Sequence, residues 1–210
     1  VVSPVMHPIF SDYQNDFKKL SDSYLKIVKL LAYIGFPLSV LLFFTSKELV
    51  LLIFGMQWGK SIPSFEILSF SVGFQIILSG SIFQATNSTK IMFFSGFISA
   101  LLYITSILIG VVYFKSIEAV SIGLLFSYVL NFILAYYLLY GIVFKSTISK
   151  VIKCIFYPIV ISLLLFLLLL GVNYFTLDTN MFISLSIKSI FSILYVTFFL
   201  QFLEIYDIKG

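Results

Sequence analysis

Residues 159–170 read IVISLLLFLLLL and form the middle of an apolar segment from about residue 152 to 175. The hydrocarbon core of a bilayer is roughly 30 Å thick, so a helix needs about 20 apolar residues to cross it. This segment is apolar on every side apart from Ser162, which predicts a peripheral helix that faces lipid. Further apolar segments predict an all-α, polytopic transmembrane helix bundle with about six spanning helices, at residues 30–44, 62–84, 91–114, 118–144, 152–175 and 181–203.

Composition agrees with a membrane protein. Of the 210 residues, 60% are hydrophobic and 10% are charged, and the mean hydropathy is +1.12. A water-soluble domain of this composition would expose large apolar patches, so that class is excluded. The single cysteine, Cys154, excludes an internal disulfide, and the single histidine, His7, excludes a multi-histidine metal site and is expected in a loop. The chain carries no phosphate-binding glycine loop, so we expect no ATP hydrolysis. We also expect no cofactor and no nucleic-acid partner.

The sequence before the first predicted span predicts an interfacial helix. Residues 15–29 place apolar side chains on one helical stripe and lysines elsewhere. This helix is expected to run into the span at 30–44, where Pro37 removes a backbone donor and is expected to bend it. Trp58 and tyrosines near segment ends fit an interfacial aromatic belt.

A short separate helix is predicted directly after the first span. Thr45 and Glu48 have the T-x-x-E spacing of a capping box, and Gly55 fits a left-handed C-terminal cap. The sequence therefore predicts a helix from about residue 45 to 55 at the far membrane face.

Lysines define the expected orientation, since all thirteen basic residues are lysine. When the loops are assigned alternately to the two sides, nine lysines fall on one side and three on the other. The richer side is expected to be cytoplasmic, which places both ends of the chain there. The richer side holds Lys18, Lys19, Lys26, Lys29, Lys90, Lys145, Lys150, Lys153 and Lys209, and the other side holds Lys47, Lys60 and Lys115.

The segment at 62–84 carries more polar groups than the other spans. If it is one straight helix, its small and polar residues fall within about 60° of one line, and a second polar row lies opposite. Two interpretations stay open: Glu66, Gln84 and Asn87 line a hydrophilic cavity, or Glu66 sits at the interface and the amides bond neighbouring helices. The first row is Glu66, Ser69, Gly73, Gly80, Gln84 and Asn87, and the second is Ser71, Gln75 and Ser79.

Two later spans have seams of small residues, which allow close approach of helices in lipid. For Asn131, which lies in one seam, packing is favoured over substrate contact. The seams are Ser95, Ser99, Tyr103, Ser106 and Gly110 in the span at 91–114, and Gly123, Ser127, Asn131 and Ala135 in the span at 118–144.

Lys188 lies inside the last predicted span, about two turns, roughly 10 Å, from its start. A lysine can extend that far to reach the interface, or it can turn inward to an ion pair or a ligand. Both alternatives are open from the sequence.

Several motifs together resemble the polysaccharide-biosynthesis flippases, the O-antigen and exopolysaccharide exporters of the multidrug, oligosaccharidyl-lipid and polysaccharide exporter superfamily. These are PVMHPIFSDYQND at 4–16, Tyr24, the Phe36-Pro37 pair, ELVLLIFGMQWGKSIPSFEIL at 48–68 and QATNSTK at 84–90. The chain departs from the family at Asn87, where glycine is frequent, and in having no arginine. The matching positions are Pro4, Pro8, Phe10, Ser11, Pro37, Glu48, Leu49, Phe54, Gly55, Trp58, Ala85 and Thr86.

The resemblance implies the C-terminal portion of a MATE-like, two-lobed transporter that works by alternating access. Residues 1–29 would be the end of a preceding helix and the cytoplasmic interfacial helix, 30–145 four helices of the C-terminal lobe, and 146–210 an accessory pair with a short tail. The chain begins at Val1, and we expect it to be the later part of a longer protein whose N-terminal lobe is on the same chain.

The implied substrate is an undecaprenyl-diphosphate-linked oligosaccharide that crosses the bacterial cytoplasmic membrane. The implied partners are this lipid-linked oligosaccharide, membrane lipids and other polysaccharide-assembly membrane proteins. Two alternative functions stay open: a polytopic polymerase or ligase of the same pathway, and a drug exporter of the same superfamily. The chain is expected not to be an enzyme, because it lacks the long loop with arginines that would hold a diphosphate. The candidate cavity residues are Glu66, Gln75, Gln84, Asn87 and Lys188.

Overall fold

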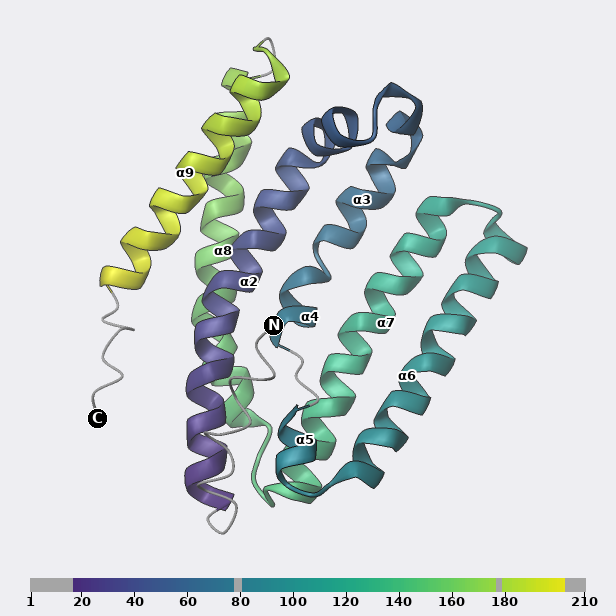
Figure 1. Ribbon diagram of the computed structural model, residues 1–210, viewed down its shortest axis with the longest axis vertical. Helices are drawn as coiled ribbons and strands as arrows, with labels where there is room; N and C mark the ends of the chain where they lie inside the picture. Colours follow the sequence, from purple (N-terminus) through teal and green to yellow (C-terminus); the bar gives the residue numbers. More distant parts are fainter. Residues whose placement is uncertain (1–16, 78–80, 177–178, 203–210) are drawn as a thin grey trace.

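The structure, a computed structural model, describes residues 17–77, 81–176 and 179–202, and these form an all-helical bundle (Figure 1). Five helical stretches are long and apolar enough to cross a membrane, and a bent pair, Met56–Ser69 with Val72–Ala85, makes a sixth if it is one span. The predicted all-α bundle of about six spans is therefore confirmed. The five stretches are Phe17–Ile53, Thr89–Phe114, Ile117–Val143, Ser149–Thr176 and Met181–Gln201.

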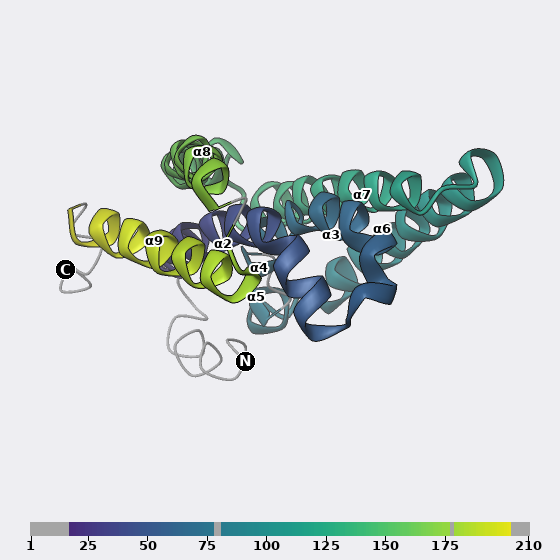
Figure 2. The same ribbon diagram turned by 90° about the horizontal axis from the view of Figure 1, so that it is seen from above.

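Helix α2 (Phe17–Ile53) lies at the centre of the bundle. It packs against α3 (Ile62–Ser69) and α4 (Val72–Ile77) on one side and against α8 (Ser149–Thr176) and α9 (Met181–Phe202) on the other. Figure 2 shows α8 and α9 at one end of the bundle and α6 and α7 at the other, with α2 between them. One long helix thus joins the two halves of the described chain.

Helix α2 is longer than the sequence predicted. The helix continues through Thr45 without a break, so the predicted capping box and separate helix at 45–55 are wrong. The Thr45 hydroxyl donates to the Leu41 carbonyl at 2.7 Å, as it does inside a helix, and Glu48 turns to another helix instead of capping. Gly55 follows the end of α2 with φ of 90° and ψ of 170°, a positive-φ conformation that favours glycine but is not the αL cap that was predicted.

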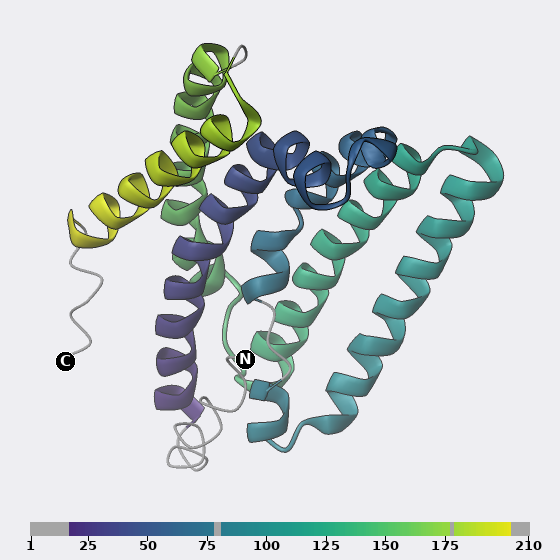
Figure 3. The same cartoon turned by 45° about the horizontal axis from the view of Figure 1, so that its top comes forward.

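The predicted straight span at 62–84 is broken. Short helix η1 (Met56–Ser61) lies across the end of the bundle (Figure 3), and α3 follows it. The helix stops at Phe70 and Ser71 before α4, and the two parts of the pair are bent by 48°. Helix α5 (Ser81–Ala85) completes the pair. Because the helix is interrupted, the predicted rows of polar residues do not continue along one face.

A close contact between α2 and α4 accounts for this interruption. The Gly73 amide donates to the Ser39 hydroxyl of α2 at 2.7 Å, instead of to a carbonyl of its own helix. A Cβ atom on Gly73 would lie 2.5 Å from Cδ1 of Phe36, and one on Gly35 would lie 3.4 Å from Cα of Gly73. The absence of side chains at these two glycines therefore lets the helix backbones meet.

Helices α6 (Thr89–Ile109) and α7 (Ile117–Leu138) pack along the two predicted seams, which confirms them. The hydroxyls of Ser106 and Ser127 are 2.6 Å apart, and the Asn131 carboxamide accepts from Ser99 and donates to Tyr103. A π turn, η2 (Gly110–Phe114), ends α6, and a second, η3 (Leu139–Val143), ends α7. Asn131 thus makes the interhelical contacts that the packing interpretation predicts.

We expect Asn131→Ala to destabilise the bundle by about 1–2 kcal/mol, because hydrogen bonds between membrane helices are worth about that much at most. The change removes the amide that joins Ser99 and Tyr103 across the seam. Thermal unfolding in detergent measures the loss, and Thr105→Ala, at an exposed hydroxyl bonded only within α6, is the matched control. Equal melting temperatures for the two variants would contradict the role of the seam.

Helix α8 is less peripheral than predicted. Its Leu165 and Leu169 are fully buried against Val40 and Phe44 of α2. The opposite face, which includes Leu163 and Leu167, is exposed and suits contact with lipid. The uniformly apolar sequence conceals which face meets protein, because lipid and protein interiors accept the same residues.

Candidate functional site

A cavity of about 390 Å³ lies where α2, α3, α8 and α9 meet, near the ends of α2 and α8. It is more polar than the helix faces around it, with carboxylates, ammonium groups, hydroxyls and an amide in its wall. Charged and polar side chains inside a membrane bundle are costly and mark functional sites by default. Its lining includes Ser46, Lys47, Glu48, Glu66, Asn173, Thr176, Thr179, Ser184 and Lys188, with apolar contributions from Phe43, Phe44, Leu170 and Met181.

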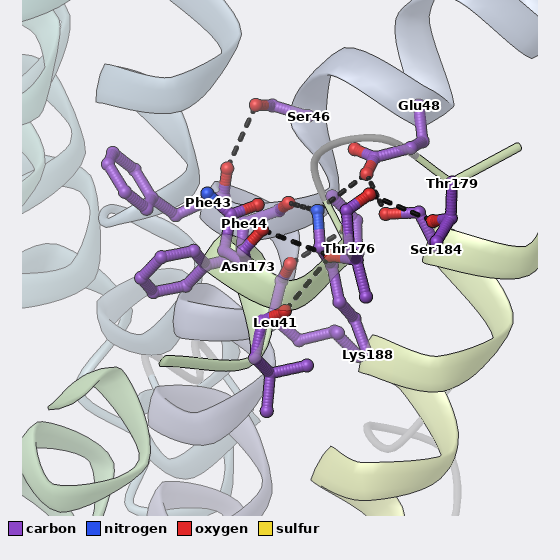
Figure 4. A network of polar contacts seen from close by, with 12 residues as sticks. Leu41, Phe43, Phe44, Ser46, Glu48, Asn173, Thr176, Thr179, Ser184 and Lys188 are labelled. Atoms are coloured by element: carbon purple, nitrogen blue, oxygen red, sulfur yellow. Dashed lines mark hydrogen bonds and ion pairs between the residues drawn. The ribbon is translucent and has the colours of Figure 1, made fainter. Parts of the chain in front are cut away.

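An ion pair between α2 and α9 forms one wall of this cavity. Lys188 Nζ lies 2.5 Å from Oε1 of Glu48 and donates to the Phe44 carbonyl at 2.9 Å. The Ser184 hydroxyl donates to the same carboxylate oxygen at 2.6 Å (Figure 4). Lys188 is 3% exposed and Glu48 is 6% exposed, so both charges are desolvated and each depends on the other.

The local sequence explains why these groups meet. Ser184 and Lys188 are four residues apart, so they lie on one face of α9 and can reach the same partner. Because α2 continues as a helix through residue 53, Glu48 stays on the face that also presents the Phe44 carbonyl. Lys188 therefore turns inward, which is one of the two alternatives left open by the sequence.

Glu66 of α3 lines the same cavity from the other side. Its Oε1 accepts a hydrogen bond from the Ser46 hydroxyl at 3.1 Å, and that hydroxyl also approaches the Phe43 carbonyl at 2.8 Å. Ser46 is two residues from Glu48 on α2. The cavity thus combines two carboxylates from different helices with the buried ammonium of Lys188.

A second cavity, of about 290 Å³, lies where α2, α5, α6 and α7 converge, and none of the described residues that line it is charged. Tyr24 and Tyr136 bring their hydroxyls to 3.1 Å, and Tyr136 donates to the Ile77 carbonyl at 2.7 Å. Asn131 and Tyr103 lie in its wall on the α6 and α7 side. The described lining of this cavity is rich in tyrosine and carries no formal charge, in contrast to the charged cavity next to α9.

The structure brings only two of the five candidate cavity residues together. Glu66 and Lys188 line the charged cavity. Gln75 is exposed and donates to the Ser71 hydroxyl at 2.7 Å, beside a different, smaller cavity. Gln84 and Asn87 are exposed near the start of α6. The break between α3 and α4 separates residues that a straight helix would align.

The motif residues that carry the family resemblance take mainly structural positions. Pro37 is buried inside α2. Phe54 and Trp58 are exposed beside Gly55, with ring centroids 6.2 Å apart. Pro4, Pro8, Phe10, Ser11 and His7 lie outside the described residues.

Glu48 is the cavity residue whose structural position sequence reasoning assigned wrongly. Its T-x-x-E spacing suggested a cap, although the residues around it are apolar enough to continue the helix. A usable signal was present: Glu48 and Lys188 are opposite charges inside apolar segments, and such charges usually pair. Ser184 also donates a hydrogen bond to Glu48, and only its spacing of four residues from Lys188 could have predicted this from the sequence.

Comparison with known proteins finds a family and relatives whose names refer to the synthesis of surface polysaccharides. A family described as "Polysaccharide biosynthesis protein" matches residues 1–63. The chain is 29% identical over 168 residues to the lipopolysaccharide biosynthesis protein WzxC of Escherichia coli K12, covering 78% of this chain and 33% of the relative. It is 26% identical over 172 residues to an uncharacterized membrane protein in the cps region of Klebsiella pneumoniae, covering 81% and 35%.

A third relative extends the match further along the chain. The teichuronic acid biosynthesis protein TuaB of Bacillus subtilis is 23% identical over 195 residues, covering 90% of this chain and 40% of the relative. No solved structure matches the chain significantly. The chain spans about a third to two fifths of the length of these curated relatives. Its multi-pass helical bundle, its motifs and these matches show that the chain is similar to membrane proteins of polysaccharide biosynthesis.

Proposed function

We propose that this chain is part of a transporter that moves an undecaprenyl-diphosphate-linked oligosaccharide across the bacterial cytoplasmic membrane for surface polysaccharide synthesis. The observation that carries the proposal is the similarity over 78% to 90% of the chain to proteins named for lipopolysaccharide and teichuronic acid biosynthesis. The helical bundle supports a transporter because its polar groups lie in cavities between helices, where a substrate path can form.

In this proposal α2 to α7 are helices of a C-terminal lobe, and α8 and α9 are the accessory pair. Both accessory helices contact α2, which also contacts α3 and α4 of the lobe. An N-terminal lobe on the same polypeptide would complete the central cavity, and the two lobes would rock to open it to either side. The polyprenyl tail can stay in lipid while the glycan crosses.

The polar groups proposed to line the path are Glu66, Gln75, Gln84, Asn87 and Lys188. The side chains of Gln75, Gln84 and Asn87 are exposed, so they are available to a glycan or to the other lobe. Amide groups suit this role because they both donate to and accept from sugar hydroxyls. Other membrane proteins of polysaccharide assembly are the proposed neighbours in the cell.

The proposal is tested by complementation with the full-length protein in a host whose own exporter gene is deleted. We expect Glu66→Ala and Gln84→Ala each to reduce surface polysaccharide about tenfold or more, equivalent to at least ~1.4 kcal/mol of lost substrate interaction. Glu118→Ala, at an exposed carboxylate at the start of α7, is the control and is expected to behave as wild type. Wild-type polysaccharide levels in both test variants, with equal protein amounts, would count against this path.

The proposed orientation places the lysine-rich end of the bundle in the cytoplasm. The starts of α2 and α8, which carry several lysines, lie at the same end of the bundle as the start of α6 (Figure 1), and Lys90 is the second residue of α6. In a Cys154→Ser background, Lys90→Cys is expected to react with a membrane-impermeant maleimide only after cells are permeabilised, because positively charged loops stay inside. Gln57→Cys, an exposed position in η1, is expected to react in intact cells. The reverse labelling pattern would overturn the orientation.

A further inference from the structure

The first turns of α2 and α8 form a lysine cluster at one end of the bundle. Both helices start at this end (Figure 1), and Lys150 Nζ lies 3.9 Å from Oδ1 of Asp22. One turn further along both helices, the Cys154 thiol donates to the Leu25 carbonyl at 3.4 Å. The lysines of the cluster are Lys18, Lys19, Lys26, Lys29, Lys150 and Lys153. Asp22 is the one acidic residue within residues 17–29 and 149–160, so positive charge predominates strongly here.

Two lysines of the cluster are available to a ligand. Lys29 and Lys153 are exposed, and neither forms an ion pair with a described residue. Lys153 precedes Cys154 in the chain, and Lys29 lies one turn after Leu25, so both flank the contact between these two residues. Their ammonium groups are carried by flexible four-carbon stems, which lets them turn toward one anion.

The cluster lies at the depth of the lipid headgroups. Helix α2 has 37 residues and is about 55 Å long, whereas the hydrocarbon core of a bilayer is roughly 30 Å thick. Residues 30–46 of α2 contain no charged side chain, so this part of the helix suits the hydrocarbon, and the lysines before it lie outside. Lysine clusters beside a spanning helix attract anionic lipids.

An apolar pocket of about 190 Å³ lies between α2 and α9, further into the membrane than the lysine cluster. Ile34 and Leu38 of α2 and Ile193 of α9 contribute to its wall, and Ile34 is 45% exposed. The hydroxyls of Ser192 and Thr197 also belong to the wall, but each donates to a carbonyl of its own helix, at 2.8 Å and 2.9 Å. The pocket is therefore suited to a hydrocarbon chain.

One side of α2 links the lysine cluster to this pocket. Residues at a spacing of four lie above one another on a helix, and this row of α2 is Lys26, Leu30, Ile34 and Leu38. The Cα atoms of Lys26 and Ile34 are about 12 Å apart along the helix axis, which is less than the roughly 15 Å of hydrocarbon in one leaflet. A phospholipid with its phosphate at the lysines thus has an acyl chain level with the pocket.

We propose that the lysine cluster and the apolar pocket together bind one anionic phospholipid. Its phosphate contacts Lys29 and Lys153, and one acyl chain lies in the pocket between α2 and α9. The negative headgroup offsets the excess of lysine, which a zwitterionic headgroup does less well because it has no net charge. The bound lipid contacts α2, α8 and α9 at once and so strengthens the attachment of the accessory helices to α2. This proposal does not depend on the proposed transport.

The headgroup site is tested by native mass spectrometry of the purified full-length protein in detergent, titrated with dioleoylphosphatidylglycerol or dioleoylphosphatidylcholine. We expect saturable binding of phosphatidylglycerol that is at least tenfold tighter than binding of phosphatidylcholine. Each lysine near an anionic lipid contributes about fivefold in affinity, so the double variant Lys29→Ala with Lys153→Ala is expected to bind phosphatidylglycerol about thirtyfold more weakly. Lys60→Ala with Lys115→Ala removes two exposed lysines at the other end of the bundle and is the matched control.

The acyl-chain site is tested by filling the pocket. Ile34→Trp places a larger side chain at a partly exposed position in the pocket wall, and it is expected to weaken phosphatidylglycerol binding about tenfold because the chain loses its space. Leu163→Trp adds the same side chain on the exposed face of α8, outside the pocket, and is expected to bind as wild type.

Three results would overturn the proposal. Equal affinity for the two phospholipids, or wild-type affinity in the folded double lysine variant, would show that the cluster does not select an anionic headgroup. Wild-type affinity in Ile34→Trp would show that no acyl chain occupies the pocket. Displacement of phosphatidylglycerol by a lower concentration of undecaprenyl diphosphate would assign the site to a polyprenyl lipid instead. No movement across a membrane is measured, so failure here and failure of the proposed transport are separate outcomes.

Discussion

Lys188→Ala is expected to lower the free energy of unfolding by about 3–5 kcal/mol, the usual cost of removing one partner of a buried ion pair. The substitution leaves the Glu48 carboxylate buried without its ammonium partner and removes the donor to the Phe44 carbonyl. Since α9 packs on α2 around this pair, we expect its first turns to detach as well. Thermal unfolding of the detergent-solubilised protein measures the loss.

Two further variants separate the ion pair from general effects of losing a lysine. Lys90→Ala removes an exposed lysine and is expected to change stability by less than about 0.5 kcal/mol. In the double variant Glu48→Gln with Lys188→Met, neither buried charge remains, so most of the lost stability is expected to return. A melting temperature for Lys188→Ala that equals that of Lys90→Ala would show that the two side chains do not pair.

Gly110→Ala is the second substitution with a large expected effect, at about 1–3 kcal/mol of destabilisation from overpacking. A Cβ atom at Gly110 would lie 2.6 Å from Cγ2 and 2.8 Å from Cα of Val120 on α7. Because one of these atoms belongs to the backbone, a rotamer change cannot relieve the contact, and α6 and α7 must move apart. The φ of −62° at Gly110 is helical, so the expected cost is one of space and not of backbone conformation.

Gly96→Ala is the matched control for this effect, because Gly96 lies in the same helical stretch, Thr89–Phe114. No heavy atom lies within 4 Å of the position where its Cβ would be built. Alanine is favoured over glycine inside a helix by about 1 kcal/mol, so this variant is expected to be as stable as wild type or more stable. If the two alanine variants melt at the same temperature, the close packing of α6 on α7 at Gly110 is contradicted.

The contact between α6 and α7 shows what could be predicted from sequence. Small and polar residues recur at helical spacing in both segments, and this periodicity alone identified the faces that meet. The structure pairs Ser106 with Ser127 and Ser99 with Asn131 as those faces require. Local periodicity was sufficient because the two helices follow each other in the chain and pack against each other along their length.

The errors have a different physical origin, since each depends on a contact between segments far apart in the chain. The break before α4 depends on the Gly73 amide meeting Ser39, which is 34 residues away. The role of Glu48 depends on Lys188, which is 140 residues away. A T-x-x-E pattern is a weak signal inside an apolar run, because tertiary partners can take up the acidic side chain and the helix continues. The site was therefore less predictable than the fold.

The most direct test of the proposed glycan transport is movement of the lipid-linked substrate in proteoliposomes that contain the full-length protein alone. Undecaprenyl-diphosphate-linked oligosaccharide is added to one leaflet, and its appearance in the other leaflet is followed with a membrane-impermeant glycan-modifying enzyme. We expect protein-dependent movement that Glu66→Ala and Gln84→Ala reduce and Glu118→Ala does not. Lengthening or transfer of the glycan without movement between leaflets would contradict the proposed transport and indicate an enzyme of the same pathway.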